Sequence, residues 1–247
     1  MSRSILIIGA TSTICRHIAL ELVRPNDKVC LAARDTSELS RIAADLRIRN
    51  NPDLLLVRKF DTNDFDTHQS MVGEVSTLLG GLDVVLVGTG ALGDQIAARS
   101  SIPAITNIIN SNFVGIATVL APIADLMERA GQGKIAVLTS VAGDRGRQSN
   151  YVYGSAKSGM SAYLGGLRNR LFRHGVTVTT VKLGFVDTKM IAGMSNAFLR
   201  ASPEAVAKKI VERLEAGAAI TYIPWFWRYI LLIIIHIPEV IFKRLKL

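Results

Sequence analysis

Ser4-Ile5-Leu6-Ile7-Ile8-Gly9-Ala10-Thr11-Ser12-Thr13-Ile14-Cys15 is the stretch of this sequence that decides the fold. Its first five residues form a short apolar run that predicts a strand, and a helical pattern opens after the glycine turn. The start of a helix presents free backbone N–H groups that suit a phosphate. Gly9, Thr11, Ser12 and Ile14 are therefore candidate phosphate-binding residues. Only one of the three usual fingerprint glycines is present, so an ordinary strand–helix turn fits equally well.

The rest of the chain repeats this alternation of strand and helix. We expect strands at residues 4–8, 28–32, 54–60, 82–87, 134–139, 176–183 and 219–223. We expect helices at residues 13–23, 37–48, 66–79, 105–129, 151–173 and 203–216, with Asp66 and Ser202 as N-caps. Most of the strands are continuous apolar runs, which indicates burial on both faces. The sequence predicts a single α/β domain over residues 1–222, a doubly wound parallel sheet with helices on both faces, followed by an apolar and basic helical tail over residues 223–247.

Composition excludes several classes of protein. The 247 residues carry 29 basic and 20 acidic side chains, a net charge of +9, and 49% of them are hydrophobic, which excludes disorder. Two cysteines, Cys15 and Cys30, exclude a disulfide scaffold and fit small buried side chains in a reducing compartment. Four scattered histidines predict no metal site. The first apolar run is too short for a signal peptide, so we expect a cytoplasmic protein. Since no basic stripe alternates with aromatic residues, we expect no nucleic-acid partner.

The loops after the strands hold further candidates, because ligands of parallel sheets bind beyond the carboxyl ends of the strands. Arg34 follows the second strand, where folds that prefer NAD place an acidic residue. An arginine there would pair with a 2′-phosphate, which favours NADP over NAD, although a solvated surface arginine is the alternative. Asp61 follows the third strand. It would accept from an adenine amino group, or serve only as a turn residue.

Tyr153 and Lys157 are four residues apart at the start of a predicted helix, so they share one face. A nearby ammonium favours the phenolate, so we expect the pKa of Tyr153 to be lowered and its hydroxyl to exchange protons near neutrality. Ser140 ends the fifth strand, where its hydroxyl would hold a carbonyl beside the phenol. A Tyr-x-x-x-Lys spacing often arises by chance. Here the strand before it and the small residues beside it argue against chance.

Together these motifs resemble the short-chain dehydrogenase/reductase family over nearly the whole chain. The resemblance is carried by Gly9-Ala10-Thr11-Ser12, by Asn112 in Asn112-Phe113-Val114-Gly115, by Ser140 in Thr139-Ser140-Val141-Ala142-Gly143, by Tyr153 with Lys157, and by Gly184 to Thr188. It implies a Rossmann-like fold, an NAD(P)H cofactor and a homo-oligomer.

The resemblance also implies a role for each matched residue. Tyr153 would be the general acid, and Ser140 would orient the substrate carbonyl. Lys157 would bind the nicotinamide ribose and lower the pKa of the phenol. Asn112 would kink its helix and hold a water that relays protons to Lys157. Gly90, Val186 and Thr188 fall in the cofactor loops, with Thr188 matching the residue that contacts the nicotinamide carboxamide.

The sequence departs from the family pattern in those loops. Thr13 and Cys15 stand where the family has glycine, so we expect the thiol to lie where the helix approaches the phosphate. Val87-Gly88-Thr89-Gly90 replaces Asn-Asn-Ala-Gly, and Leu183 replaces a proline. A catalytically silent module that binds NAD(P)H is therefore an alternative to an active enzyme.

The tail from Trp225 onward is rich in Ile, Leu and aromatic residues, and the mean hydropathy of the chain is +0.31. Its longest apolar run, residues 229–235, is too short to span a bilayer, and Pro238 would interrupt a helix. Charged residues recur as a possible stripe and crowd the end: Arg228, His236, Glu239, Lys243, Arg244 and Lys246. The tail therefore predicts a helix pair in the membrane interface, with an oligomer contact or a lid as alternatives.

The tail narrows the resemblance within the family. Five segments are similar to reductases of a 2-keto pentofuranose on a polyprenyl phosphate. They are Gly90 to Asp94, Tyr151 to Lys157, Trp227-Arg228-Tyr229, His236-Ile237-Pro238 and residues 241–245. Such enzymes complete an epimerisation in cell-envelope glycan synthesis, and a flavin-dependent oxidase partner makes the ketone. The resemblance implies a lipid-linked sugar substrate and a peripheral position on the inner face of the membrane. A steroid, retinoid or acyl ketone is the alternative substrate.

Overall fold

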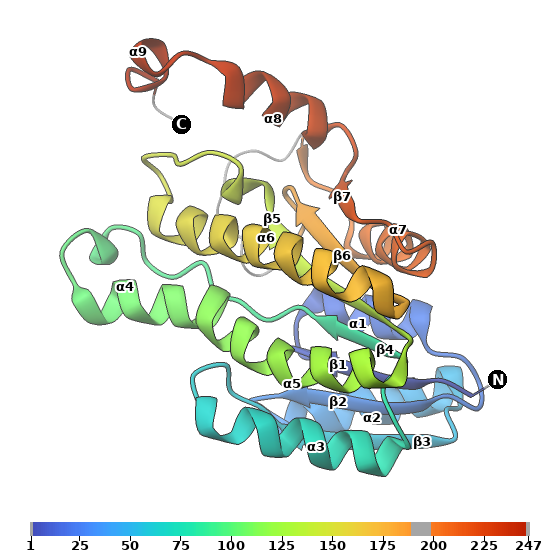
Figure 1. Ribbon diagram of the computed structural model, residues 1–247. Helices are drawn as coiled ribbons and strands as arrows, with labels where there is room; N and C mark the ends of the chain where they lie inside the picture. The colour runs from blue at the N-terminus through green and yellow to red at the C-terminus, as the bar shows by residue number, and fades with distance from the viewer. Residues whose placement is uncertain (1, 189–198, 246–247) are drawn as a thin grey trace.

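A computed structural model describes residues 2–188 and 199–245 of the chain. One parallel sheet of seven strands runs through the described residues in the order β3-β2-β1-β4-β5-β6-β7 (Figure 1). The strands are β1 (Ser4–Ile8), β2 (Lys28–Ala33), β3 (Leu54–Lys59), β4 (Val84–Val87), β5 (Gly133–Ser140), β6 (Val176–Leu183) and β7 (Ile220–Ile223). The order reverses between β1 and β4, so the predicted doubly wound α/β sheet is confirmed.

Helices cover both faces of the sheet (Figure 1). Ile5 and Ile7 pack with side chains of α1 (Thr13–Leu22), α2 (Thr36–Asn50) and α7 (Pro203–Glu215). Leu6 and Ile8 point the other way, toward α3 (His68–Leu79), α5 (Gly115–Ala130) and α6 (Tyr151–Leu171). All four side chains are completely buried, as the continuous apolar runs predicted. Cys15 and Cys30 are also buried and free, one in each layer.

The two predicted N-caps have different outcomes. The Ser202 side chain accepts from Ala205 N at 3.2 Å, with proline at the first position of α7, so this cap is confirmed. The Asp66 cap is wrong, because Asp66 lies inside a short 3-10 turn (Phe65–Thr67) and α3 starts at His68 with no side-chain cap. An acidic residue in the turn before a helix produces the same local pattern as a true cap.

The predicted helix at residues 105–129 is one interrupted helical segment. It starts earlier, at α4 (Ile102–Ile109), because Ser101 accepts from Ala104 N at 3.4 Å and caps it. A π-helical turn (Asn110–Val114) then connects α4 to α5. By length and composition alone, Ile102–Ala130 is the one helix among the described residues that could cross a membrane. Many apolar side chains of α5 form part of the core, with Ile116, Val119, Leu120 and Ile123 fully buried, whereas Ile102 at the start of α4 is exposed.

The tail folds back onto the domain as α8 (Trp227–His236) and α9 (Glu239–Phe242), separated at Pro238 (Figure 1). Trp227 and Leu231 are buried in a small apolar cluster with Val141. The guanidinium of Arg145 donates to the carbonyls of Ile234 and Ile237, each at 2.7 Å, and pairs with Glu239 at 2.9 Å. It also lies 3.7 Å from the centre of the Phe242 ring. The end of α8 and the start of α9 are therefore fixed by one side chain. Lys246, predicted in the polar stripe, lies outside the described residues.

The sulfur of Cys15 lies near the start of α1, but it is completely buried. It lies between α1 and the end of β4, where a Cβ added to Gly88 would lie 2.1 Å from Sγ. The thiol thus fills the space above a glycine, next to Ser12 at the start of α1. Burial raises its pKa to about 11. The two departures from the family pattern, at positions 15 and 88, therefore compensate each other in volume.

Gly88→Ala should destabilise the protein by about 2 kcal/mol, because the new methyl group would overlap the Cys15 sulfur. Adding Cys15→Ala should recover much of that loss, so the two substitutions should be strongly non-additive in denaturant unfolding. Gly73→Ala is the matched control. A Cβ there meets nothing within 4 Å, and alanine favours the helix. Equal stability of the double variant and of Gly88→Ala would contradict this packing.

Candidate active site

Ser140, Tyr153 and Lys157 come together at the carboxyl end of β5. Ser140 is the last residue of β5, and the other two lie in the first turns of α6. The connection after Ser140 lies directly on α6. A Cβ at Gly143 would lie 2.7 Å from the backbone carbon of Lys157, and one at Gly154 would lie 2.9 Å from the Ala142 carbonyl oxygen. Side chains at these two positions would push the serine away from the helix.

Lys157 carries its amino group out of contact with water. The residue is 3% exposed, and Nζ donates to the Leu138 carbonyl at 3.4 Å. Nζ also lies 5.6 Å from the centre of the Tyr153 ring. Among the described residues no carboxylate pairs with it, so burial lowers its pKa to about 8.

The pKa of Tyr153 does not follow the prediction. Burial raises the pKa of the phenol to about 12, and a hydrogen bond with Ser140 opposes this only in part. The expected lowering by Lys157 is therefore wrong for the structure as it stands. Desolvation of the phenolate outweighs any effect of the Lys157 ammonium, which lies 5.6 Å from the centre of the ring. The hydrogen bond nevertheless places the Ser140 and Tyr153 hydroxyls side by side, as expected.

Asn112 lies in the π-helical turn, so the predicted irregularity in its helix is present. Its Nδ2 donates to the carbonyls of Ala91 at 2.7 Å and Ile108 at 2.9 Å, while the buried Oδ1 has no partner. A Cβ on Gly90 would lie 2.6 Å from that oxygen and 3.1 Å from Lys157 Nζ. Both atoms thus face the space beside Gly90. An unpaired acceptor and an ammonium with one weak acceptor, the Leu138 carbonyl, fit a ribose hydroxyl or a water there.

The first loop has the geometry of a phosphate site. Gly9 has φ +84° and lies so close to the next loop that a Cβ would be 2.8 Å from Thr89 N. Ser12 caps α1 by accepting from Cys15 N at 3.1 Å. Within the described residues, the amides of Thr13 and Ile14 have no acceptor. Two free N–H groups at the positive end of a ten-residue helix fit a pyrophosphate.

Arg34 and Asp61 lie in the loops after β2 and β3. Arg34 is exposed and has no ion-pair or hydrogen-bond partner in the described part of the chain. Asp61 accepts from Asn63 N at 3.0 Å, so it has the turn role that was its alternative. The adenosine contacts of both residues remain predictions.

The loop after β6 is held from outside by the tail. Val186 is buried and bridges to Ala201, so only its backbone is placed to reach a ligand. Thr188 is partly exposed, and the next ten residues lie outside the described part. A Cβ on Gly184 would lie 1.9 Å from the Trp227 indole nitrogen. This contact was missed at the sequence level, as was Arg145, since nothing local in the sequence pairs the tail with these loops.

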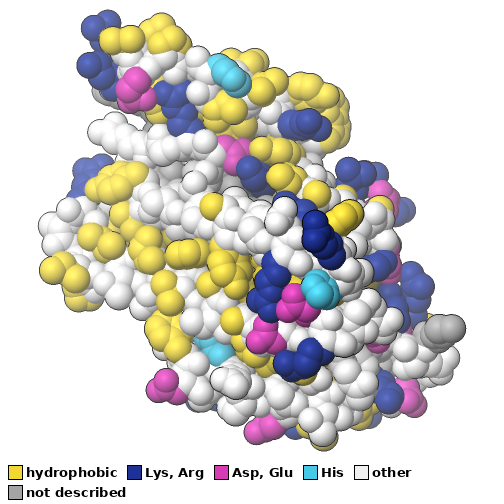
Figure 2. All heavy atoms as spheres, viewed as in Figure 1, with side chains coloured by type: hydrophobic (Ala, Val, Ile, Leu, Met, Phe, Trp, Pro, Cys, Tyr) yellow, Lys and Arg dark blue, Asp and Glu magenta, His cyan; other side chains and the backbone are white. Residues whose placement is uncertain are grey.

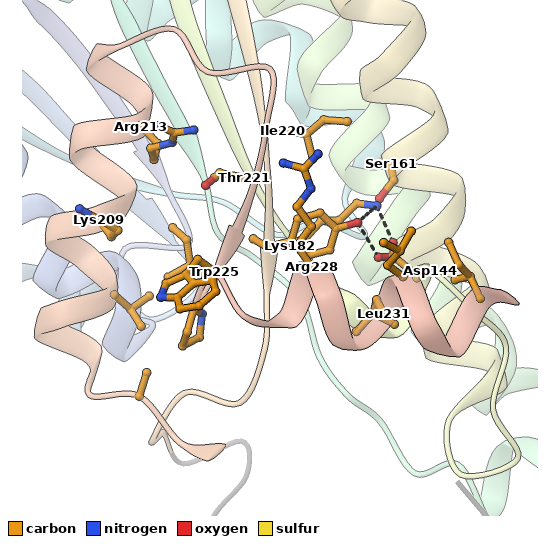
Figure 3. A pocket seen from close by; sticks show the side chains of 18 of the residues that line it. Asp144, Ser161, Lys182, Lys209, Arg213, Ile220, Thr221, Trp225, Arg228 and Leu231 are labelled. Carbon is orange, nitrogen blue, oxygen red and sulfur yellow. Dashed lines mark hydrogen bonds and ion pairs between the residues drawn. The ribbon is translucent and has the colours of Figure 1, made fainter. Parts of the chain in front are cut away.

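A groove of about 1130 Å³ lies beneath α8, against the β7 edge of the sheet (Figure 3). Ser140, Tyr153 and Lys157 do not line it, so it neighbours the catalytic group without containing it. Inside it, Asp144 pairs with Lys182 at 2.5 Å and accepts from the Tyr222 hydroxyl at 2.8 Å (Figure 3). These contacts fix the segment between Ser140 and Tyr153 to β6 and β7.

Comparison with known proteins agrees with this geometry. The family model for short chain dehydrogenases matches residues 3–197. An uncharacterized oxidoreductase of Mycobacterium tuberculosis is 32% identical over 98% of this chain and 96% of its own. Levodione reductase has a similar fold, with a TM-score of 0.81 and 20% identity over 90% of this chain and 95% of its own. So does an alcohol dehydrogenase of the archaeon Thermococcus sibiricus, solved with 5-hydroxy-NADP, with a TM-score of 0.78 and 21% identity over 90% and 96%.

The family match covers most of the chain and includes the serine, the tyrosine and the lysine that meet beyond β5. The chain belongs to the short-chain dehydrogenase family and is an NAD(P)-dependent oxidoreductase.

Proposed function

We propose that the protein is an NADPH-dependent reductase of a ketone carried on a lipid. The substrate that we favour is a 2-keto sugar on a polyprenyl phosphate, by resemblance to the reductase subunit of decaprenylphosphoryl-ribose 2′-epimerase. The observation that carries the proposal is the position of α8. Its buried side packs on Val141, next to Ser140, while its other side exposes large apolar residues such as Ile233. An apolar helix beside a carbonyl-reducing group suits a substrate with a long apolar anchor.

Each residue of the site would have its own role in the reduction of a carbonyl group. A bound nicotinamide cofactor would supply the hydride for the carbonyl carbon. Ser140 would donate a hydrogen bond to the carbonyl oxygen, and Tyr153 would give its phenolic proton to the same oxygen as it becomes an alkoxide. The ammonium of Lys157 would then return a proton toward the phenolate. Asn112 Oδ1 would hold the hydroxyl or water through which that proton moves.

The cofactor preference depends on Arg34. An exposed guanidinium without a partner after β2 is suited to pair with a 2′-phosphate, which supports NADPH over NADH. The free amides of Thr13 and Ile14 support phosphate binding despite the missing glycines.

The proposal also includes the location of the enzyme in the cell and its protein partners. The apolar tail supports a peripheral position on the inner face of the membrane, where a polyprenyl substrate resides. A flavin-dependent oxidase partner that makes the ketone, and a homo-oligomeric state, belong to the proposal through the family resemblance.

Tyr153→Phe should abolish reduction of the lipid-linked keto-sugar, because the variant lacks the phenolic proton that Tyr153 would give to the alkoxide. Binding of NADPH, followed by nicotinamide fluorescence, should remain within about twofold of the unmodified protein. Turnover of the variant at the normal rate would overturn the assignment. A protein that binds cofactor but turns over no keto-sugar, steroid, retinoid or acyl ketone would be the silent binding module instead.

Arg34→Glu should weaken NADPH binding by about tenfold or more, the loss expected for one charged hydrogen-bonded pair. NADH binding should change little, because NADH lacks the 2′-phosphate. Titration of both cofactors measures the ratio of the NADPH and NADH dissociation constants directly. Arg47→Glu, an equal charge change at an exposed position of α2, is the control. If the unmodified protein binds NADH more tightly than NADPH, the proposed reductase activity stands, but the proposed role of Arg34 is overturned.

Lys157→Met should stabilise the cofactor-free protein at neutral pH, by up to about 3 kcal/mol. Below pH 8 the amine is charged in both the folded and unfolded chain, so the folded chain carries the full cost of burying it. Between the lowered pKa of about 8 and the ordinary pKa of 10.5, the folded amine loses its proton first, and the advantage of methionine should fade. Thermal unfolding across this range, with Lys208→Met as an exposed control, measures the change. A gain in stability that is the same at every pH would contradict the burial of a charged amine at Lys157.

A further inference from the structure

Two segments flank the catalytic group, one on each side. On one side, Ala98 and Ile108 pack with Val152 and contact Tyr153. The Gln95 side chain fixes this segment by accepting from Val152 N at 3.1 Å. On the other side, Trp227 and Leu231 pack on Val141. We call residues 94–105, which include the start of α4, the α4 rim.

Both segments expose apolar side chains on their outer surfaces. In the α4 rim, Ile96 is 74% exposed and Ile102 is 77% exposed. In the tail, Tyr229, Ile233 and Ile241 are 53–70% exposed, and Trp225, which also lines the groove beneath α8, is 72% exposed. Hydrophobic side chains gather over the start of α4, at the left of the view, and over α8–α9, along the top (Figure 2). The surface is thus apolar on both sides of the catalytic group.

The charges on this surface are mainly positive. Arg99 in the α4 rim and Lys243 and Arg244 in the tail are exposed, and within residues 2–188 and 199–245 none of them forms an ion pair. Arg228 also has no ion pair there, but it lines the groove beneath α8 (Figure 3). The acidic groups nearby already have partners. Asp94 caps its own turn by accepting from Ile96 N at 2.8 Å and Ala97 N at 3.0 Å, and Glu239 pairs with Arg145.

We propose that the α4 rim and the tail form one docking surface for an anionic lipid bilayer, with the catalytic group between them facing the lipid. Apolar side chains enter the interface and unpaired cations meet the headgroups, while Trp225 and Tyr229 have the amphipathic rings that such interfaces favour. A second copy of the chain suits this surface less well, because its cations would meet cations. The proposal extends the proposed function, which placed only the tail at the membrane. It orients the site so that a ketone at the headgroup level reaches Tyr153.

The test is flotation of the full-length protein with vesicles of phosphatidylcholine and phosphatidylglycerol. Ile96→Ser with Ile102→Ser should reduce the bound fraction about tenfold, and added salt should weaken binding of the unmodified protein. The matched control is Ile48→Ser, which removes an 85% exposed isoleucine from α2, away from the site. NADPH titration checks that each variant keeps its fold.

Each outcome decides a separate claim. If the double variant of the α4 rim floats as well as the control, while Ile233→Ser with Ile241→Ser does not, the tail alone binds and the two-sided surface is overturned. If the unmodified protein does not float at all, the proposed docking surface and the proposed membrane position are both overturned. Reduction of a ketone would still be judged by the Tyr153→Phe assay. Loss of dimers in the α4 rim variant without any change in flotation would assign the surface to a second copy.

Discussion

A lysine amino group held out of water determines the arrangement of the catalytic end of the sheet. Lys157 has one weak acceptor, the Leu138 carbonyl, and no carboxylate within the described structure. Burying a charge without a counter-charge costs free energy, so the surrounding elements must hold it there. They do so through backbone contact: the turn after β5 crosses the lysine at Gly143 so closely that a side chain would not fit. That contact also sets the position of Ser140 relative to Tyr153.

The same region contains an acceptor without a donor. Asn112 Oδ1 is buried and unpaired, although its Nδ2 makes two good hydrogen bonds. Proteins satisfy nearly all buried polar atoms, so one orphan acceptor beside one under-paired ammonium is informative. Neither satisfies the other, because both are directed at the space beside Gly90. The site is therefore complete only when a small hydroxyl group or a water lies between them, which is the requirement that a ribose or a proton relay would meet.

Much of the fold could be predicted because burial on both faces leaves a strong signal in the sequence. Apolar runs such as Ser4–Ile8 have few alternatives to a buried strand. The ends of helices were harder to predict from the sequence. Ser101 caps α4 although the prediction began the helix at residue 105, and Asp66 resembles a cap only in its spacing. Residue spacing placed Tyr153 and Lys157 on one face, but it carries no information on desolvation, so the direction of the phenol pKa was wrong. The orientation of the Cys15 sulfur depends on Gly88, which lies far away in the sequence.

Helix α8 is apolar on two opposite sides. A helix of a single globular domain usually has one apolar face, so a second apolar side needs cover of its own. One side of α8 is covered: Leu231 is buried with Val141, and Trp227 lies on Gly184 in the loop after β6. Arg145 fixes its last turn from the loop that joins Ser140 to Tyr153. The opposite side, with Tyr229 and Ile233, is exposed. The inner contacts of α8 thus reach the loops after β5 and β6 directly. The excess hydropathy of the sequence is thus located next to the chemistry, where an apolar substrate would need it.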